Sequence, residues 1–500
     1  MPPLEHWAEA SPTAAAVISD HGAVTFAELD RNANRLANAL RSLGLVEGDA
    51  IALVCPNRPE FIEVLYGCQR GGFRLTPVNW HLTADEVAYI VDDCDAKVLI
   101  ADASIRSAVD AFNLADRCEI GLAIGDGGGP FQDYGTALES ADDRPVTTSP
   151  GGMMLYTSGT TGKPKGVYRP APVTGAGSIN IGGYAEEGGD SHLCAGPLYH
   201  AAPMVFSLRM PLEMGAAVVL MDKWDAEEAL RLIDEHRITH SHMVPTMFHR
   251  LLALPAATRD TYDTTSLKHV IHGAAPCPVA DKRAIIDWFG PVVWEYYGAT
   301  EGMGSFVDSA TWLTKPGTVG RPSDKDHVIV GDEDGAPLPT GEVGLVYMKA
   351  SGATKFEYHK DEEKTRSTFK GEYFTLGDVG YLDDDGFLFL TDRSANLIIS
   401  GGVNIYPAEV DEVLLLHEAV ADVATIGVPD EAWGEMVLAV VELNDGSDES
   451  DALASALIEH CRKHLASFKC PRRLEFSGEL PRSDNGKIYK RRLREQYRTD

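Results

Sequence analysis

Basic residues are scarce in this chain of 500 residues. Lysine and arginine number 44 against 75 aspartate and glutamate residues, so the formal net charge is −31 at pH 7. Such a balance repels nucleic acid and anionic membrane surfaces, which argues against either as the main partner. Hydrophobic residues make up 44% and charged residues 24% of the chain. This composition is that of a globular protein and excludes collagen, coiled coil and global disorder.

Cysteine and long apolar runs are also rare. The eight cysteines show no CxxC spacing, which is typical of a reduced cytoplasmic protein and not of a disulfide scaffold. The first residues, MPPLEHWAEASP, lack the basic and apolar segments of a signal peptide. The most apolar stretches, such as residues 214–221, are too short to span a bilayer. We therefore expect a cytoplasmic protein with no integral membrane segment. Its oligomeric state stays open, a homodimer included.

Strand and helix patterns alternate along most of the chain. Apolar β-branched runs at residues 50–55 and 96–101 are strand signals, and residues 60–69 and 84–92 show helical periodicity. This alternation predicts an α/β fold with parallel sheets covered by helices. The same pattern recurs as strands at 238–244, 267–271 and 292–297 and as helices at 224–236, with Asp225 as N-cap, and 278–289.

The last third of the chain has a different texture. Short strands with Gly–Asp turns occupy residues 317–393 and predict an antiparallel subdomain. A smaller unit begins after about residue 393. Residues 397–459 contain no lysine or arginine, whereas residues 460–500 carry twelve of them against five acidic residues. This segregation suggests that the basic end faces anionic groups, although on charge alone a solvated basic helix is the favoured interpretation.

The strongest local signal is YTSGTTGKPKG at residues 156–166. Small hydroxyl residues alternate with glycines, and two lysines follow. Glycines let backbone N–H groups approach an oxyanion, while hydroxyl and ammonium groups complete a phosphate cradle. Gly159 and Gly162 are too close together for the GxxxxGK[ST] loop, and Pro164 replaces its hydroxyl residue. The segment therefore predicts a phosphate-binding loop of another type.

This motif resembles the phosphate loop of the adenylate-forming superfamily, which comprises acyl-CoA synthetases, amino-acid adenylation domains and beetle luciferases. The resemblance implies that a carboxylic acid reacts with ATP to give an acyl-adenylate and pyrophosphate, and that a thiol then displaces AMP. Further motifs follow in the superfamily's order over nearly the whole chain: PLYHAAP (197–203), HGAAP (272–276), YYGATEG (296–302), YFTLGDVGYLDDDG (373–386), DRSANLIISGGVNIYPAEV (392–410) and LPRSDNGKIYKRRLR (480–494).

The resemblance assigns the groups that this chemistry requires. The acid and the triphosphate are both anionic, so positive charge must neutralise them. Lys487 resembles the catalytic lysine that bridges the substrate carboxylate and the α-phosphate, although by charge alone it is one more lysine of a basic tail. Glu301 resembles the Mg²⁺ ligand, since a hard cation prefers carboxylate oxygen, and Thr300 the hydroxyl that contacts the α-phosphate. His200 resembles an aromatic gate beside the acyl tunnel.

The resemblance also assigns nucleotide contacts. Tyr297 resembles the ring that stacks on adenine, although a core tyrosine is the commoner interpretation of the residue by itself. Gly273 and Ala274 resemble the backbone along adenine and the acyl group. Asp378 resembles the acceptor of both ribose hydroxyls, and Arg393 the contact to ribose and phosphate. The phosphate loop adds Thr157, Ser158, Gly159, Thr160, Thr161, Gly162, Lys163 and Lys165.

In relatives, the C-terminal domain rotates between the two half-reactions. The resemblance therefore implies an N-terminal domain at 1–392, a hinge at 393–396 and a small, mobile α+β lid at 397–500. The larger domain would hold the parallel sheets and the antiparallel subdomain. Family members usually carry Asp or Lys in the hinge, where this chain has Ala395.

The leading hypothesis is an acyl-CoA synthetase that uses ATP, Mg²⁺ and CoA. Gly401 and Gly402 resemble the loop that lines the pantetheine tunnel. Relatives that activate α-amino acids hold the amino group with an Asp just after the PLYH position, where Ala201 and Ala202 stand here. The alternatives are an aryl-acid CoA ligase, an acyl-AMP ligase that loads a carrier protein, and a non-catalytic sensor on the same fold. The intact charged site residues argue against the sensor.

We expect an apolar and adaptable acid pocket, because the candidate residues carry no charge and include four methionines. An apolar pocket discriminates a methylene by only about 1–3 kcal/mol, so we expect a fatty acid first, in lipid metabolism, and an aryl acid second. The His240–His242 pair has strand spacing, but no cysteine or carboxylate completes a metal site. The pocket candidates are Met204, Val205, Phe206, Met243, Val244, Met247, Ala275, Tyr296 and Met303.

Overall fold

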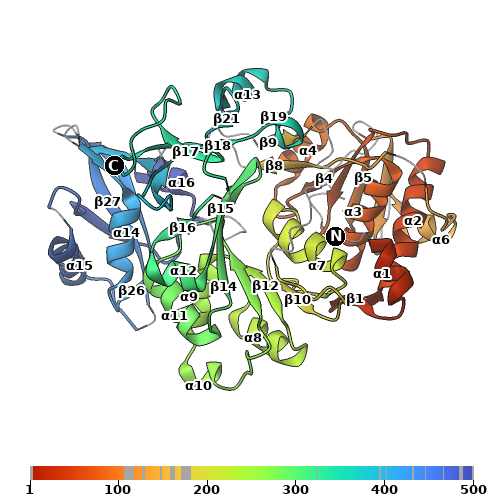
Figure 1. The fold of residues 1–500 in the computed structure, drawn as a ribbon, viewed down its shortest axis with the longest axis horizontal. Helices are drawn as coiled ribbons and strands as arrows, with labels where there is room; N and C mark the ends of the chain where they lie inside the picture. Colours follow the sequence, from red (N-terminus) through yellow and green to blue (C-terminus); the bar gives the residue numbers. More distant parts are fainter. Residues whose placement is uncertain are drawn as a thin grey trace.

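Five β-sheets organise the described part of the chain (Figure 1). The N-terminal elements form one side of the molecule and the C-terminal elements the other, with the antiparallel strands between them. The computed structural model describes residues 4–105, 118–126, 130–146, 149–157, 164–169, 182–322, 324–393, 396–400, 403–430, 433–444, 446–465, 467–482 and 488–497.

The first sheet is parallel throughout, in the order β4-β3-β5-β6-β7. Its central strands are apolar and buried, as expected for a sheet covered on both faces. The strands are β3 (Ala50–Val54), β4 (Arg74–Val78), β5 (Ala96–Asp102), β6 (Ile120–Ile124) and β7 (Gln132–Asp133), and the associated helices are α1 (Leu4–Ala10), α2 (Phe26–Ser42), α3 (Pro59–Gly71), α4 (Ala84–Asp93) and α6 (Tyr134–Glu139).

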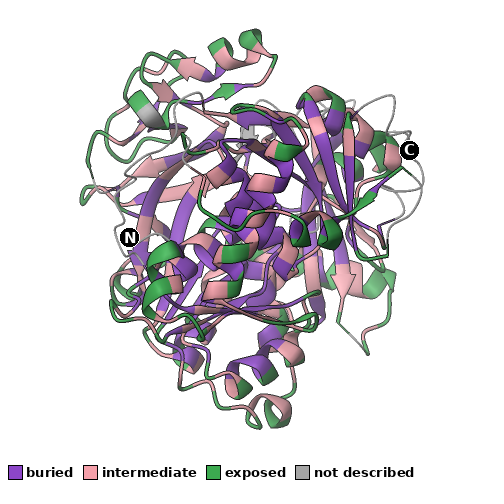
Figure 2. Ribbon diagram, turned by 90° about the vertical axis from the view of Figure 1, so that its right-hand side faces the viewer, coloured by how far each residue is buried: buried purple, intermediate pink, exposed green. Residues whose placement is uncertain are grey.

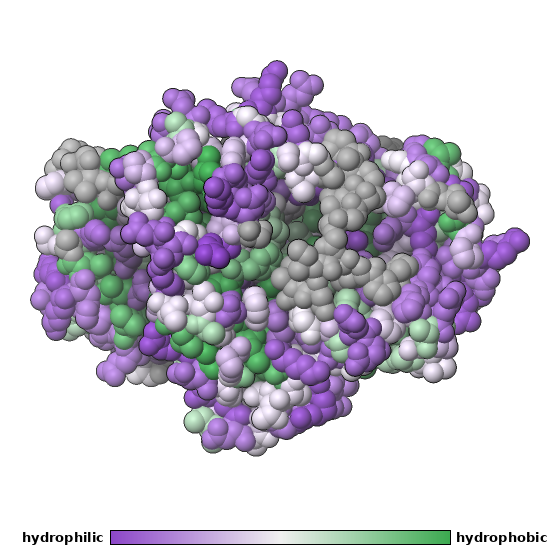
Figure 3. All heavy atoms as spheres, viewed as in Figure 1, coloured by the Kyte–Doolittle hydropathy of each residue, from purple (hydrophilic) through white to green (hydrophobic). Residues whose placement is uncertain are grey.

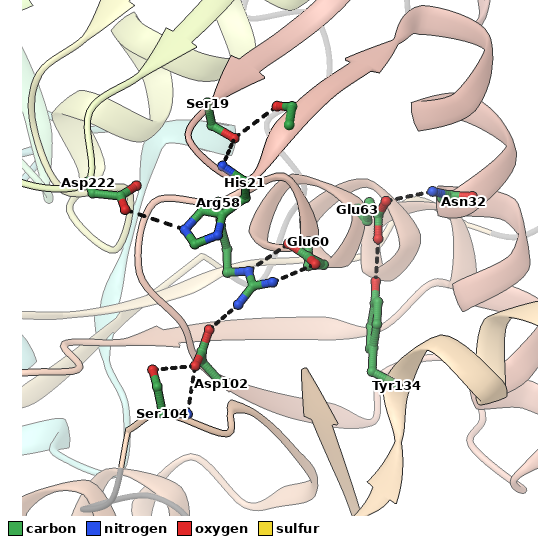
Figure 4. Close-up of polar contacts among 11 residues, drawn as sticks. Ser19, His21, Asn32, Arg58, Glu60, Glu63, Asp102, Ser104, Tyr134 and Asp222 are labelled. Atoms are coloured by element: carbon green, nitrogen blue, oxygen red, sulfur yellow. Dashed lines mark hydrogen bonds and ion pairs between the residues drawn. The ribbon is translucent and has the colours of Figure 1, made fainter. Parts of the chain in front are cut away.

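A charged network fixes the ends of these strands (Figure 4). Arg58, the N-cap residue of α3, donates two hydrogen bonds of 2.7 Å to Glu60 and forms an ion pair with Asp102 at the end of β5. Nearby, burial raises the pKa of Glu63, which accepts a 2.9 Å hydrogen bond from the Tyr134 hydroxyl. Each of these charged side chains therefore has polar partners, which offset part of the cost of its burial.

The second sheet has the order β15-β14-β13-β12-β10-β11-β1-β2, parallel inside and antiparallel at both edges. Asp225 caps α8 by accepting from the Glu228 amide at 2.9 Å, so this helix begins at Ala226, after the predicted start at 224. The strands are β1 (Ala15–Ser19), β2 (Gly22–Thr25), β10 (Ser191–Cys194), β11 (Ala217–Leu220), β12 (His240–Met243), β13 (His269–His272), β14 (Val293–Ala299) and β15 (Gly302–Asp308). The helices are the π-helix η2 (Pro203–Arg209), α7 (Met210–Glu213), α8 (Ala226–Glu235), α9 (Pro245–Ala253), α10 (Ala256–Arg259), α11 (Val279–Phe289) and α12 (Ser309–Thr314).

Two antiparallel sheets follow. One has the order β16-β23-β22-β18-β21-β20, with β17 added beside β18, and the other is the three-stranded β19-β9-β8. The elements are β8 (Met154–Thr157), β9 (Lys165–Tyr168), β16 (Thr318–Gly320), β17 (Val328–Gly331), β18 (Gly344–Lys349), η3 (Gly352–Thr354), β19 (Glu357–Tyr358), α13 (Glu362–Thr368), β20 (Phe369–Lys370), β21 (Tyr373–Phe374), β22 (Asp378–Leu382) and β23 (Leu388–Arg393).

The C-terminal sheet has the order β25-β24-β27-β26, and β28 pairs in parallel with β27. Its elements are β24 (Ile398–Ser400), β25 (Val403–Ile405), α14 (Pro407–Leu415), β26 (Val420–Asp430), β27 (Gly434–Leu443), α15 (Asp451–His464), β28 (Arg473–Phe476) and α16 (Lys490–Tyr497).

Buried residues concentrate on the strands and on the inner faces of the helices (Figure 2). Hydrophilic residues predominate on the face of the molecule drawn in Figure 3. All eight cysteines are free. Among the helices that the structure describes, none combines the length and the apolar character required to cross a membrane. The predicted α/β class, with parallel sheets, an antiparallel subdomain and a C-terminal α+β unit, is confirmed.

Candidate active site

Strands β8 and β9 flank the predicted phosphate loop as an antiparallel hairpin, in which Thr157 is the register partner of Lys165. The Lys165 ammonium lies 2.6 Å from Asp361 Oδ2, and this hydrogen bond lowers the pKa of the Asp361 carboxyl. Asp361 also caps α13. Lys165 thus anchors the hairpin to the antiparallel subdomain, and its predicted phosphate contact stays a prediction. Ser158, Gly159, Thr160, Thr161, Gly162 and Lys163 lie outside the described residues.

Thr300 and Glu301 form the tight turn between β14 and β15. Arg169, the residue after β9, donates hydrogen bonds to the Thr300 carbonyl (3.0 Å) and the Glu301 carbonyl (2.8 Å). The Tyr358 hydroxyl donates to Glu301 Oε1 at 2.9 Å. The contacts of Arg169 and Tyr358 connect the turn to the three-stranded sheet β19-β9-β8, which flanks the predicted phosphate loop. Sequence reasoning missed Arg169 and Tyr358, because no spacing in the chain links them to the turn.

Tyr297 and Asp378 come together from different sheets. The Tyr297 hydroxyl donates to Asp378 Oδ2 at 2.7 Å. A side chain on Gly304 could not be accommodated, since its Cβ would stand 2.5 Å from Tyr297 Cδ1. Arg393 is the register partner of Asp378 across β22 and β23, and its side chain is outside the description. The structure therefore groups the residues predicted for adenine and ribose.

The backbone after β13 is tightly constrained. A Cβ on Gly273 would lie 2.6 Å from both Cε1 and the carbonyl oxygen of Tyr296. Ala274 adopts the left-handed conformation with φ 68°. An L-residue there is strained by about 1–2 kcal/mol, and such strain concentrates at functional sites. Backbone rather than side chain thus approaches the space beside Tyr296.

The predicted acid-pocket residues separate into several groups. Phe206, Tyr296 and Met303 share one cluster with Ile271 and Trp294. Met243, Val244 and Met247 pack in the core around α9, whereas Met204 packs toward the first sheet and Ala275 is partly exposed. Val205 is 39% exposed, because it lies on the outer face of the π-helix.

His200 precedes the π-helix, and its carbonyl accepts from the Met204 amide at 3.1 Å. Its ring lies 4.7 Å from that of Tyr199. π-Helical backbone is rare in proteins, and where it occurs it is often at a functional site. The predicted gate residue, His200, is therefore followed closely in the chain by an unusual backbone segment.

The remaining predictions concern the Asp383–Asp385 turn, a metal site, the hinge, the pantetheine loop and the catalytic lysine. The Asp383–Asp385 turn pairs with Lys315 at 2.7 and 2.6 Å, which accounts for its charge. Within the described ranges, no group of three or more His, Cys, Asp or Glu side chains could hold a metal ion. Ala395, Gly401, Gly402 and Lys487 lie outside the described residues.

The comparisons with known proteins place the chain in the class of adenylate-forming enzymes. Residues 4–356 match the family model described as AMP-binding enzyme, and residues 409–487 match that of the AMP-binding enzyme C-terminal domain. The chain belongs to the AMP-binding enzyme family. The predicted superfamily and the predicted AMP-forming acid–thiol ligase class are confirmed.

The alignments with similar proteins cover almost all of this chain and almost all of each relative. The long-chain-fatty-acid–CoA ligase FadD13 of Mycobacterium tuberculosis is 33% identical over 95% of this chain and 93% of its own. The feruloyl-CoA synthase of an Amycolatopsis species is 33% identical over 98% and 97%. The crystal structure of the anthranilate CoA ligase AuaEII with anthranoyl-AMP superposes with a TM-score of 0.89, at 26% identity over 99% and 96%.

Proposed function

We propose that this chain is an acyl-CoA synthetase, which converts a carboxylic acid, ATP and CoA into acyl-CoA, AMP and pyrophosphate. The observation that carries the proposal is that Arg169 and Tyr358 hold the turn of the buried Glu301 beside strands β9 and β19, while Tyr297 bonds to Asp378 at 2.7 Å. Two relatives that align over nearly the full length are named as a long-chain-fatty-acid–CoA ligase and a feruloyl-CoA synthase. Both names include CoA, which supports CoA as the acceptor. An aryl-acid CoA ligase is the second candidate, favoured by the structural neighbour with anthranoyl-AMP.

The residues divide the first half-reaction among them. Tyr297 and Asp378 hold the nucleoside, and the hairpin binds the phosphates. The acid carboxylate attacks the α-phosphorus, and the bond to pyrophosphate breaks. Lys487 supplies positive charge between the two anions, and a preorganised donor of this kind is worth about 3–4 kcal/mol.

The residues present fit a Mg²⁺ ion. Mg²⁺ usually binds through one or two carboxylates together with substrate phosphates, and the buried Glu301 carboxylate stands beside the phosphate-loop hairpin. Glu301 and the triphosphate would hold the ion, which supplies charge neutralisation when it is bound. The Tyr358 hydroxyl holds the Glu301 carboxylate, and Arg169 holds the backbone of the turn that carries it.

We further infer a mobile lid at residues 397–500 with a hinge at 393–396. The lid has its own sheet and its own apolar core, and Lys490 forms a 2.7 Å ion pair with Asp411 inside it. Arg494 Nη2 donates to Asn396 Oδ1 at 3.1 Å, so the lid also contacts the last residue of the hinge. A cytoplasmic location and a part in lipid metabolism remain predictions from sequence alone.

The test is a panel of alkyl and aryl acids, scored by AMP release with and without CoA. We expect Lys487→Ala to abolish adenylate formation while thioester synthesis from supplied acyl-AMP is partly retained. The exposed Lys463→Ala is the matched control and should behave as wild type. Equal loss of both half-reactions in Lys487→Ala would contradict the role of Lys487. If no acid caused cleavage of ATP, the proposed synthetase function would be wrong.

A further inference from the structure

Three histidines stand side by side across the second sheet. His192 of β10, His240 of β12 and His269 of β13 are register partners on neighbouring parallel strands. All three are buried, at 1%, 1% and 7% exposure. Because register partners on parallel strands point to the same face, the three imidazoles form a row, which we call the histidine row.

The histidine row lines a small cavity together with Tyr184 and Phe206. The Tyr184 ring stacks on His240 at 3.9 Å, and its hydroxyl bonds to His192 Nδ1 at 2.7 Å. His240 Nε2 bonds to the Gly182 carbonyl at 2.9 Å. His192 Nε2 is buried and finds no hydrogen-bond partner in the part of the chain that the structure describes. The cavity wall thus presents a polar group that needs a partner.

The imidazoles of His192 and His240 are uncharged near neutral pH. Burial lowers the pKa of His192 well below its ordinary value and that of His240 to about 4. A neutral imidazole donates from one ring nitrogen and accepts at the other. A ligand against His192 Nε2 therefore needs a neutral polar group such as a hydroxyl or a carbonyl.

The cavity lies toward the beginning of β13, whose first residue, His269, lines it. Gly273, which is predicted to lie along the acyl group, directly follows the end of β13, and four residues of strand span about 13 Å. Tyr296 and His242 stand between these levels, joined by a 3.1 Å hydrogen bond.

Phe206 connects the two levels. Its ring lies 4.9 Å from that of Tyr296 and 5.7 Å from that of His242, and it also lines the cavity. Phe206 thus contacts both the histidine row and Tyr296, whose ring lies against Gly273.

We propose that the histidine row is the far wall of the acid pocket and selects planar aromatic acids that carry a hydroxyl group at the end remote from the carboxylate. The inference rests on the proposed acyl-CoA synthetase function and names its substrate class. A remote hydroxyl would satisfy His192 Nε2, and the flat rings of Tyr184, Phe206 and the imidazoles suit an aromatic body. An alkyl terminus would leave the imidazole unpaired. The structure thus shifts the expectation from a fatty acid to a hydroxyaryl acid.

The experiment compares 4-hydroxycinnamate, cinnamate and decanoate by acid-dependent ATP–pyrophosphate exchange. We expect wild type to prefer 4-hydroxycinnamate over cinnamate at least tenfold in kcat/KM. His192→Phe should remove this preference chiefly by raising KM for the hydroxylated acid relative to that for cinnamate. The exposed His464→Phe is the control and should keep the wild-type ratio.

Tyr184→Phe gives a second test that adds no bulk, because it removes only the hydroxyl that orients His192. It should reduce the same ratio at least threefold, and circular dichroism verifies that both variants fold. Exchange with equal kcat/KM for the two aryl acids, or a preference for decanoate, would overturn this proposal and leave the synthetase function standing. Absence of exchange with every acid would overturn both.

Discussion

Removal of the Lys282 ammonium tests how the sheet beneath the site is supported. Lys282 of α11 and Glu295 of β14 form an ion pair, with side chains 1% and 7% exposed. The ammonium also lies 4.7 Å from the centre of the Trp312 ring. Burial raises the pKa of Glu295, and the attraction of Lys282 opposes that rise. Lys282→Met keeps the volume of the side chain and deletes its charge.

The expected cost is large because the carboxylate would remain buried without its cation. Breaking a buried pair from one side costs about 3–5 kcal/mol, whereas replacing both partners with apolar residues is often neutral. Lys282→Met should therefore lower the free energy of unfolding by about 3–5 kcal/mol, and Lys282→Met/Glu295→Leu should recover most of it. The pKa of Glu295 is raised in the folded state, so its protonated form is favoured there and the penalty of Lys282→Met should shrink as pH falls toward 4.5.

Urea unfolding followed by tryptophan fluorescence measures both variants at pH 7 and pH 5. A loss below about 1 kcal/mol in the single variant would refute the reasoning, since a buried lone carboxylate cannot be that inexpensive. A double variant less stable than the single one would refute it as well. The exposed pair Arg231–Glu228 provides the control, because a surface ion pair contributes about 0–1 kcal/mol.

Two further predictions concern the site and its histidines. Gly273→Ala would place a Cβ 2.6 Å from Tyr296, so we expect a destabilisation of about 1–3 kcal/mol and at least a tenfold loss of adenylation, measured by thermal unfolding and pyrophosphate exchange; wild-type exchange would contradict the close approach. His240 has a pKa lowered from 6.5 to about 4, so the stability that its neutral form contributes is present above pH 6.5 and is lost as pH falls toward 4, by about 3 kcal/mol. His240→Gln should flatten the unfolding free energy over this range relative to wild type and to the exposed control His6→Gln, and an unchanged slope would disprove the assignment.

Local patterns predicted most of the elements correctly. The run at residues 50–55 contains β3, which ends one residue earlier, the helical pattern at 60–69 lies within α3, and the alternation of such segments gives the parallel sheets. Boundaries were less accurate, because the end of a strand depends on its neighbours. The strand predicted at 238–244 is shorter in the structure, where β12 spans His240–Met243. Ile238 and Val244 lie outside it although both are apolar enough to extend it. The partners of β12 end its ladder at Met243.

The sequence by itself determined the family, the order of the motifs and the residue types that the chemistry needs, since these are properties of the chain read in order. Tertiary structure decided which distant groups meet. Tyr358 reaches Glu301 and Tyr297 reaches Asp378 only because three sheets converge at the ends of their strands. The histidine row likewise arises from register between β10, β12 and β13. Register depends on the packing of whole strands, which no local spacing encodes.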